Sequence, residues 1–214
     1  MFQLSVTSLQ QVPEVAHCHM ASFPDSFGTK LGLAYSIKSM EWFLAGANRF
    51  LFHIKEDGRV IGYCGGFQPT GLGDGSTSGM MQYAMKEAAT GMLIKPWLFF
   101  HKDVLRFYPL IMKNIVRKIT GAKNAPVANP AGIHRIPSIG LVVIGVHPAY
   151  RGKGCFELLM HHFESECKQR NVAKMTLSVK SSNARAIRAY KKAGWVSEKE
   201  TGQAIEMYKT LLHA

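Results

Sequence analysis

The residues best placed to do chemistry lie in the last third of the sequence, in a basic turn rich in glycine. Pro148 fixes the exit from an apolar run, and Gly152 and Gly154 let the backbone curl into the start of a helix. A helix N-terminus presents unpaired N–H groups at the positive end of its dipole, and Arg151 and Lys153 add full charges there. The turn therefore predicts an anion site, for which pyrophosphate is a natural ligand.

A second motif begins about 30 residues after Arg151 and follows another predicted strand. Ser182 or Asn183 is typical of a helix N-cap, and Gly194 is typical of the residue that ends a helix. The spacing predicts a short helix over 184–193 that carries Tyr190 on its apolar side. On these grounds alone, Tyr190 is either a reactive hydroxyl or a buried ring of a core helix.

Together the two motifs resemble the signatures of the GNAT superfamily of N-acetyltransferases. The first signature, a strand with Val-x-Pro-x-Tyr and then Arg/Gln-x-x-Gly-x-Gly/Ala before a helix, is matched by Val146, Pro148, Tyr150, Arg151 and Gly154. The second, Asn-x-x-Ala-x-x-x-Tyr-x-x-x-Gly-aromatic, is met in full by Asn183, Ala186, Tyr190, Gly194 and Trp195. The resemblance covers residues 138–210, extends to 1–68 in layout only, and leaves 69–136 without a counterpart.

The resemblance implies the α/β (α+β) fold of that family, a mixed and mostly antiparallel central sheet flanked by helices, in one domain spanning 1–214. It also implies acetyl-CoA as co-substrate and no metal. The strand residues that would pair with the pantetheine arm are Ile144, Gly145 and Val146. The turn residues that would hold the pyrophosphate are Arg151, Gly152, Lys153, Gly154, Cys155 and Phe156. Asn183 would lie beside the cofactor arm, and Tyr190 would act as the general acid that protonates the leaving thiolate.

Two positions depart from the family pattern. Phe156 stands where a small residue usually closes the pyrophosphate turn, although its amide can still donate. Ser178 stands where members that acetylate protein N-termini often carry a glutamate that serves as general base. Glu206, His147 or an ordered water can replace that base. The missing glutamate favours an amine on a small molecule, such as an amino sugar or amino acid, over a peptide N-terminus.

Composition limits the classes of ligand and compartment. Lys and Arg number 26 against 14 acidic residues, and the net charge of +12 favours anionic ligands and disfavours polycationic acceptors. No apolar run approaches the roughly 20 residues that span a bilayer, and no secretory or transit signal is recognised at the N-terminus. The four cysteines are scattered, and His17 and His19 point in different directions on a helix. We therefore expect a cytoplasmic protein without a metal site.

The earlier residues predict the elements that must hold these motifs. A strand over residues 2–9, a helix over 12–22 and a second helix over 31–44 precede a hairpin with its turn at Asp57–Gly58. A Gly- and Ser-rich loop is expected at 70–79, followed by helices and a linker over 124–137. One of those helices is basic and amphipathic, with Ile111, Ile115 and Ile119 on one stripe.

The remaining residues predict a strand over 138–146, a helix over 155–170, a strand over 173–180 and two closing strands after 196. The helical insertion over 69–136 enters before the cofactor strand, near the expected acceptor cleft, where it would serve as a lid or a homodimer contact.

Three functions of different classes are compatible with the sequence. The first is N-acetyl transfer from acetyl-CoA to a primary amine by direct attack in a ternary complex, on a small molecule or, as an alternative, on a protein or peptide. The second is a CoA-binding module without turnover, favoured by Phe156 and Ser178. The third, nucleic-acid binding, rests on charge alone. We expect neither a membrane nor a nucleic acid as partner.

Overall fold

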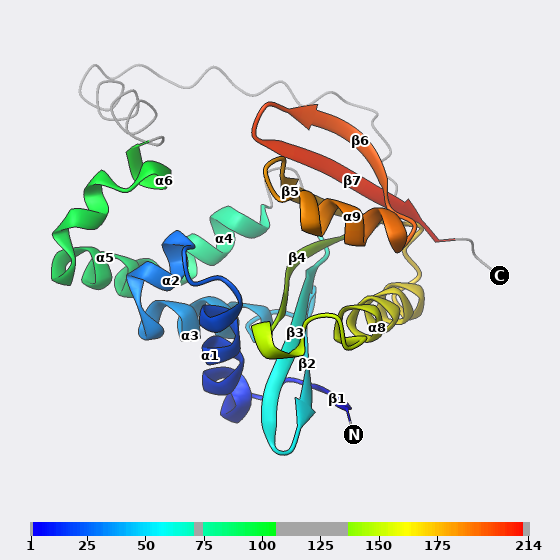
Figure 1. Ribbon diagram of the computed structural model, residues 1–214, viewed down its shortest axis with the longest axis horizontal. Coiled ribbons are helices and arrows are strands. Elements are labelled where there is room, and N and C mark those ends of the chain that lie inside the picture. Colours follow the sequence, from blue (N-terminus) through cyan, green and yellow to red (C-terminus); the bar gives the residue numbers. More distant parts are fainter. Residues whose placement is uncertain (1, 71–74, 106–136, 212–214) are drawn as a thin grey trace.

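The computed structural model describes residues 2–70, 75–105 and 137–211. They form a seven-stranded sheet with the strand order β1-β2-β3-β4-β5-β7-β6 (Figure 1). The strands are β1 (Gln3–Val6), β2 (Arg49–Glu56), β3 (Arg59–Phe67), β4 (Ser138–Val146), β5 (Lys174–Lys180), β6 (Val196–Thr201) and β7 (Ala204–Thr210). All neighbouring strands run antiparallel except β4 and β5, which are parallel. The predicted mixed, mostly antiparallel sheet is confirmed.

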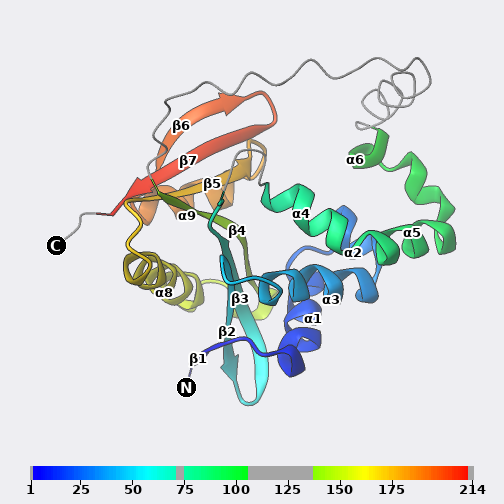
Figure 2. The same ribbon diagram turned by 180° about the vertical axis from the view of Figure 1, so that it is seen from behind.

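Helices cover both faces of this sheet. The α-helices are α1 (Val12–Ser22), α2 (Phe27–Leu31), α3 (Leu33–Glu41), α4 (Ser76–Tyr83), α5 (Met85–Ile94), α6 (Lys102–Leu105), α8 (Cys155–Gln169) and α9 (Ala184–Lys192). The 3₁₀ helices are η1 (Leu9–Gln11), η2 (Trp42–Leu44), η3 (Pro96–Phe100) and η4 (Pro148–Tyr150). Helices α8 and α9 pack on one face of the sheet, and α1 and α3 pack on the other (Figures 1 and 2).

Most predicted elements lie where the sequence indicates. Helix α1 has the predicted bounds, and the β2–β3 hairpin turns at Asp57 and Gly58, whose φ values of 49° and 76° fit the turn preferred between right-twisted strands. The second predicted helix, 31–44, corresponds to α3 and η2 and begins after Gly32, whose φ is 115°. The short helix α2 before it was not predicted.

The insertion differs from its prediction at its start. The expected loop over 70–79 ends earlier, since α4 begins at Ser76. Helices α4 and α5 contact α3, and α5 lies on the outer side of α2 and α3, away from the β6–β7 hairpin in both views (Figures 1 and 2). The predicted amphipathic helix with Ile111, Ile115 and Ile119 lies outside the described residues, as do residues 71–74 and nearly all of the 124–137 linker.

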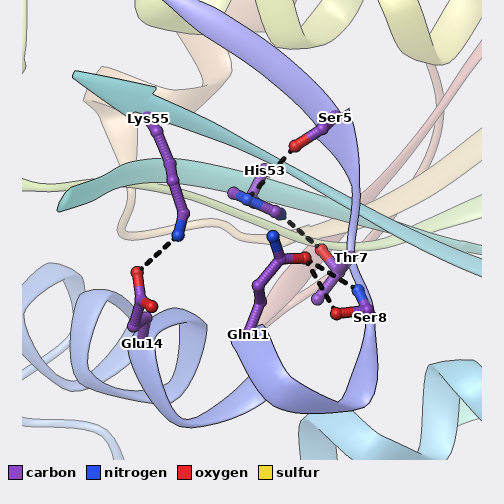
Figure 3. A network of polar contacts seen from close by, with 7 residues as sticks. All are labelled: Ser5, Thr7, Ser8, Gln11, Glu14, His53 and Lys55. Atoms are coloured by element: carbon purple, nitrogen blue, oxygen red, sulfur yellow. Dashed lines mark hydrogen bonds and ion pairs between the residues drawn. The ribbon is translucent and has the colours of Figure 1, made fainter. Parts of the chain in front are cut away.

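Polar contacts fix the N-terminal strand to the edge of the sheet (Figure 3). His53 is fully buried on β2, and its two ring nitrogens lie 2.9 Å from the Thr7 hydroxyl and 3.3 Å from the Ser5 hydroxyl. Lys55 pairs with Glu14 of α1 at 2.9 Å. These contacts join β1, β2 and α1 into one unit. In the described part of the chain, no helix is long and apolar enough to cross a membrane.

Candidate active site

The centre of the sheet contains a wedge where β4 and β5 separate. Register pairs join the two strands only from Ser138 with Lys174 to Leu141 with Leu177. Strand β4 continues to Val146, and its other edge stays paired with β3. The backbone of β4 from Val142 to Val146 therefore faces an opening, where an extended ligand can hydrogen-bond as an added strand. Ile144, Gly145 and Val146, the predicted pantetheine-pairing residues, all lie along this opening.

The predicted pyrophosphate turn lies at the end of the wedge. Gly152 and Gly154 have φ values of 80° and 83°, a region that favours glycine, and a Cβ atom at either position would meet no atom within 4 Å. Helix α8 begins directly after Gly154, so the amides of Cys155, Phe156 and Glu157 have no partner within the helix. The turn is exposed, and its geometry fits an anion held by backbone N–H groups.

The two basic side chains of the turn have different surroundings. The Arg151 guanidinium donates from Nε to the Val146 carbonyl at 3.2 Å and from Nη2 to the Ser22 carbonyl at 2.9 Å. Its side chain thus fastens the turn to β4 and to the end of α1, which sequence reasoning did not anticipate. The Lys153 ammonium lies 4.9 Å from the ring centre of Tyr150 and belongs to an exposed residue.

Phe156 does not fill the turn. Its ring packs against that of Tyr190, with 5.7 Å between ring centres, and joins the core beneath α8 and α9. Because the side chain points away from the turn, the bulk that distinguishes Phe156 from the family's small residue leaves the helix amides accessible.

Asn183 is the N-cap of α9, as predicted from its position. Its side-chain oxygen accepts a hydrogen bond from the Ala186 amide at 3.1 Å. At the other end, Gly194 takes a φ of 84° and closes the helix. The two capping residues of the motif therefore fix where α9 begins and ends, and with it the position of Tyr190.

Tyr190 is buried in the core between the sheet and helices α8 and α9. Its ring lies between those of Phe156 and Trp195, with 6.0 Å between the Tyr190 and Trp195 ring centres. Burial raises the pKa of Tyr190 well above that of a free tyrosine. The Cys64 thiol, on the register partner of Ile144, is near enough to raise the pKa of Tyr190 further. The phenol is therefore protonated at neutral pH and able to donate.

A pocket of about 370 Å³ opens where β4 and β5 begin to separate. Ser178 and Glu206 line it from β5 and β7, Gly140 and Val142 line it from β4, and Ser76 of the insertion also contributes. Leu177 and Met207 also border the pocket, but both are buried in the core that holds Tyr190, so their neighbours Ser178 and Glu206 point to the other face of the sheet. Glu206 and Tyr190 therefore lie on opposite faces of the sheet beside the wedge.

The candidate bases are separated by the length of β4. Glu206 is the direct cross-strand partner of Ser178, so its carboxylate originates beside the position where the family glutamate would be. His147 lies at the other end of β4, next to the pyrophosphate turn, where its Nδ1 accepts from the Ala149 amide at 3.4 Å. Of the two, Glu206 faces the pocket.

Sequence reasoning missed a buried pair on the α1 side of the wedge. A hydrogen bond of 2.5 Å joins His19 Nδ1 to the hydroxyl of Tyr63, a fully buried residue. Burial lowers the pKa of His19 to about 4. The sequence does indicate that His19 faces the core, since it follows Val15 and Ala16 at helical spacing and so continues the buried stripe of α1.

This pair predicts a loss of stability in acid. Because the folded-state pKa of His19 is about 4 and that of a free histidine is 6.5, the unfolded chain binds a proton more readily below pH 6.5. We expect the free energy of unfolding to fall as pH drops from 6.5 to 4, by up to about 3 kcal/mol from this residue. Urea unfolding of the parent and His19→Gln at pH 7.5 and 4.5 measures it. The exposed neighbour His17, as His17→Gln, is the control; an equal acid loss in His19→Gln would contradict the assignment.

Gly145 has a packing role as well as its predicted place along the cofactor arm. A side chain at this position would lie 2.4 Å from the Tyr63 ring. We expect Gly145→Ala to lower the free energy of unfolding by about 1–3 kcal/mol, because the ring is buried and held by His19. Gly140→Ala, on the same strand with no neighbour closer than 3.7 Å, is the matched control. Denaturant unfolding of both variants measures the difference, and equal stabilities would contradict the packing argument.

No group of three or more His, Cys, Asp or Glu side chains arranged to hold a metal occurs within 2–70, 75–105 and 137–211. All four cysteines are buried free thiols. Burial raises the pKa of each, to about 11 for Cys18 and about 12 for Cys167. None is therefore an activated nucleophile.

Known proteins that are similar in sequence or in fold belong to one family. Residues 127–195 match the model of the acetyltransferase (GNAT) family. No curated protein matches the sequence. The resemblance to the GNAT superfamily is confirmed. The matched residues include the turn that follows β4 and the motif from Asn183 to Trp195.

Solved structures share the GNAT fold over nearly the whole chain. The ribosomal-protein-S18-alanine N-acetyltransferase of Escherichia coli is 17% identical with a TM-score of 0.54, covering 100% of this chain and 96% of that one. The PaiA N-acetyltransferase of Thermoplasma acidophilum, solved in complex with coenzyme A, is 11% identical with a TM-score of 0.59 and 99% coverage of both chains. Ard1 of Thermoplasma volcanium is 14% identical with a TM-score of 0.57 and 99% coverage of both. At these identities the GNAT structures establish the fold.

Proposed function

We propose that this GNAT protein transfers an acetyl group from acetyl-CoA to a primary amine on a small molecule, by direct attack in a ternary complex. The observation that carries the proposal is the arrangement around the wedge. A buried, protonated tyrosine lies on one face of the sheet, and a carboxylate that faces a pocket lies on the other. Acyl transfer to an amine needs both groups, an acid for the leaving sulfur and a base for the nitrogen.

The residues of the wedge fit the shape and charge of acetyl-CoA. The backbone of β4 from Val142 to Val146, which has no strand partner on the β5 side, suits the amides of the pantetheine arm, with the Val146 carbonyl already accepting from Arg151. The N-terminus of α8, with Gly152 and Gly154 leaving its approach open, suits the pyrophosphate. When bound, acetyl-CoA supplies a thioester whose acyl carbon an amine can attack.

The chain's own groups complete the proton balance. An amine arrives as an ammonium, and Glu206 accepts a proton from it so that the nitrogen lone pair can form the new C–N bond. Tyr190 gives its hydroxyl proton to the sulfur as the C–S bond breaks. The nitrogen loses its second proton as the amide forms, and that proton returns through solvent to the Tyr190 phenolate, so that one proton is released overall, by way of Glu206. None of these transfers requires a covalent intermediate on the protein, and this agrees with the lack of an activated cysteine thiol.

The pocket favours a small acceptor with hydroxyl groups. Its volume is about 370 Å³. Of its two carboxylates, that of Glu198 is paired with Lys174 at 2.6 Å, and that of Glu206 has no such partner among the described residues. Thr176 and Ser178 add hydroxyl groups to the lining. One free carboxylate and several hydroxyls suit an amino sugar or a hydroxylated amino acid. We place the reaction in the cytoplasm, where free thiols stay reduced.

Thiol release from acetyl-CoA, followed with a disulfide reagent across amino sugars, amino acids and peptides with free N-termini, tests the proposal. We expect acceptor-dependent release with at least one amino sugar or amino acid. Release with peptides alone would assign a protein or peptide N-acetyltransferase, a class that includes the ribosomal-protein-S18-alanine enzyme, which is similar in fold. Calorimetric binding of acetyl-CoA without release on any acceptor would leave a CoA-binding module.

A further inference from the structure

A second pocket lies at the β1 edge of the sheet, away from the wedge between β4 and β5. It has a volume of about 670 Å³ and is bounded by the end of β1, the turn from η2 into β2, and the last turns of α8. We call it the edge pocket. Phe43, Phe50, Leu51 and Phe52 give it an apolar floor. Its size and lining are typical of sites that bind small organic molecules.

Arg49 places a fixed positive charge in this apolar setting. Its guanidinium lies 4.1 Å from the ring centre of Trp42, and its Nη1 donates to the Trp42 carbonyl at 3.0 Å. Its Nε is buried without a hydrogen-bond partner. No carboxylate pairs with Arg49 in the part of the chain that the structure describes. A buried guanidinium donor without an acceptor is uncommon in native proteins. Because the guanidinium also carries a charge that no carboxylate neutralises, an anionic ligand suits it better than a neutral one.

The other charges of the edge pocket cancel one another. Arg170 donates to Glu166 at 2.8 Å and to the Ala47 carbonyl at 3.0 Å. Glu41 pairs with Lys38 at 2.8 Å. The ring of His162 packs on that of Phe52, and burial lowers the pKa of His162, which disfavours its charged form. The charge of Arg49 is therefore the one left uncompensated among the described groups of the pocket.

The walls of the edge pocket are fixed before any ligand binds. Thr7, which lines it, is held by His53 through the contact drawn in Figure 3. Arg170 is stacked on Phe50, with 4.8 Å from its guanidinium carbon to the ring centre. Leu9 and Val6 form an exposed apolar rim. A prearranged site loses less entropy when a ligand binds.

We propose that the edge pocket binds an organic carboxylate with an apolar body, its carboxylate on the free donors of Arg49 and its apolar part on the phenylalanine floor. A neutral apolar molecule would leave the guanidinium donor unsatisfied, and a small inorganic anion would leave the apolar floor exposed to water. The site is separate from the wedge, so its ligand does not displace acetyl-CoA.

Calorimetric titration with octanoate, on the full chain saturated with coenzyme A, tests the assignment. Saturation with coenzyme A prevents octanoate from occupying the wedge. We expect saturable binding of octanoate to a single site, and weaker binding of octanol. Arg49→Met is expected to weaken octanoate binding by about 10- to 100-fold, because a charge-assisted hydrogen bond is lost. Arg59→Met, an exposed arginine on the hairpin, is the matched control and should bind as the parent does.

A second pair of variants keeps the test decisive if Arg49→Met does not fold. Leu9 is 65% exposed on the rim, so its replacement leaves the core intact. Leu9→Glu should weaken octanoate binding by repulsion, and Leu9→Lys should strengthen it or leave it unchanged. The absence of saturable octanoate binding to the protein saturated with coenzyme A, or equal affinity in the two Leu9 variants, would each overturn the assignment.

Discussion

Tyr190→Phe is expected to lower kcat for acetyl transfer by about 10²- to 10⁴-fold, the range typical of a lost general acid. The ring stays in place, so its packing on Phe156 and Trp195 is retained. The thiolate would then leave without a proton from the protein. The KM for acetyl-CoA should change little, because the backbone of β4 and the turn before α8 remain. Steady-state kinetics with a saturating amine measures the effect.

The structure makes this substitution a clean test. The Tyr190 hydroxyl has no hydrogen-bond partner among the described residues, so its removal leaves no polar atom newly unsatisfied. The thermal midpoint of Tyr190→Phe should match that of the parent. Tyr190→Ala is less informative, since a cavity in place of a buried aromatic ring typically costs about 3–5 kcal/mol. Normal turnover in a folded Tyr190→Phe protein would remove Tyr190 from the mechanism.

Local chemistry determines how much of the fold can be predicted from the sequence. The β2–β3 hairpin is predictable because Asp57 and Gly58 adopt positive φ readily. Helix α9 is predictable because Asn183 and Gly194 are capping residues. Helix α2 was not predicted, because its five residues are too few to show a helical repeat of apolar positions, and Gly32 ends it directly before α3.

The candidate site is only partly contained in its motifs. The motif residues mark the turn and α9, but the wedge exists because the register of β4 and β5 stops at Leu141 and Leu177. No local pattern encodes that stop. The contact of Arg151 with Ser22 joins residues 129 positions apart. The link of His19 with Tyr63 spans 44 positions. Long-range contacts of this kind depend on tertiary packing, which periodicity along the chain does not reveal.

The place of the carboxylate follows from strand pairing. Ser178 lacks the acid that the family often has, yet Glu206 lies directly across the β5–β7 ladder from it. Residues opposite each other in an antiparallel pair have their Cβ atoms about 5 Å apart and point to the same face. The position of a functional group can thus be kept while its strand changes, and the sequence alone shows only that a carboxylate exists at 206.

Glu206→Gln is expected to lower kcat by about 10²- to 10⁴-fold, because the amide cannot accept the proton that the ammonium must lose. The side chain keeps its size, so the pocket and the ladder between β5 and β7 are preserved. Glu198→Gln is the matched control in the same pocket. Its carboxylate is paired with Lys174, and its loss should leave turnover within a few-fold of the parent, since such exposed pairs contribute at most about 1 kcal/mol.

The register between β5 and β7 allows the same role to be tested by rescue. In the double variant Glu206→Gln and Ser178→Glu, the carboxylate moves to the facing position and should restore part of the lost kcat. A merely structural role for Glu206 predicts no rescue, because the second substitution adds a charge without repairing a contact. His147→Gln distinguishes the remaining candidate base, which lies beside the pyrophosphate turn. If His147→Gln abolished turnover while Glu206→Gln preserved it, the base would lie at the other end of β4.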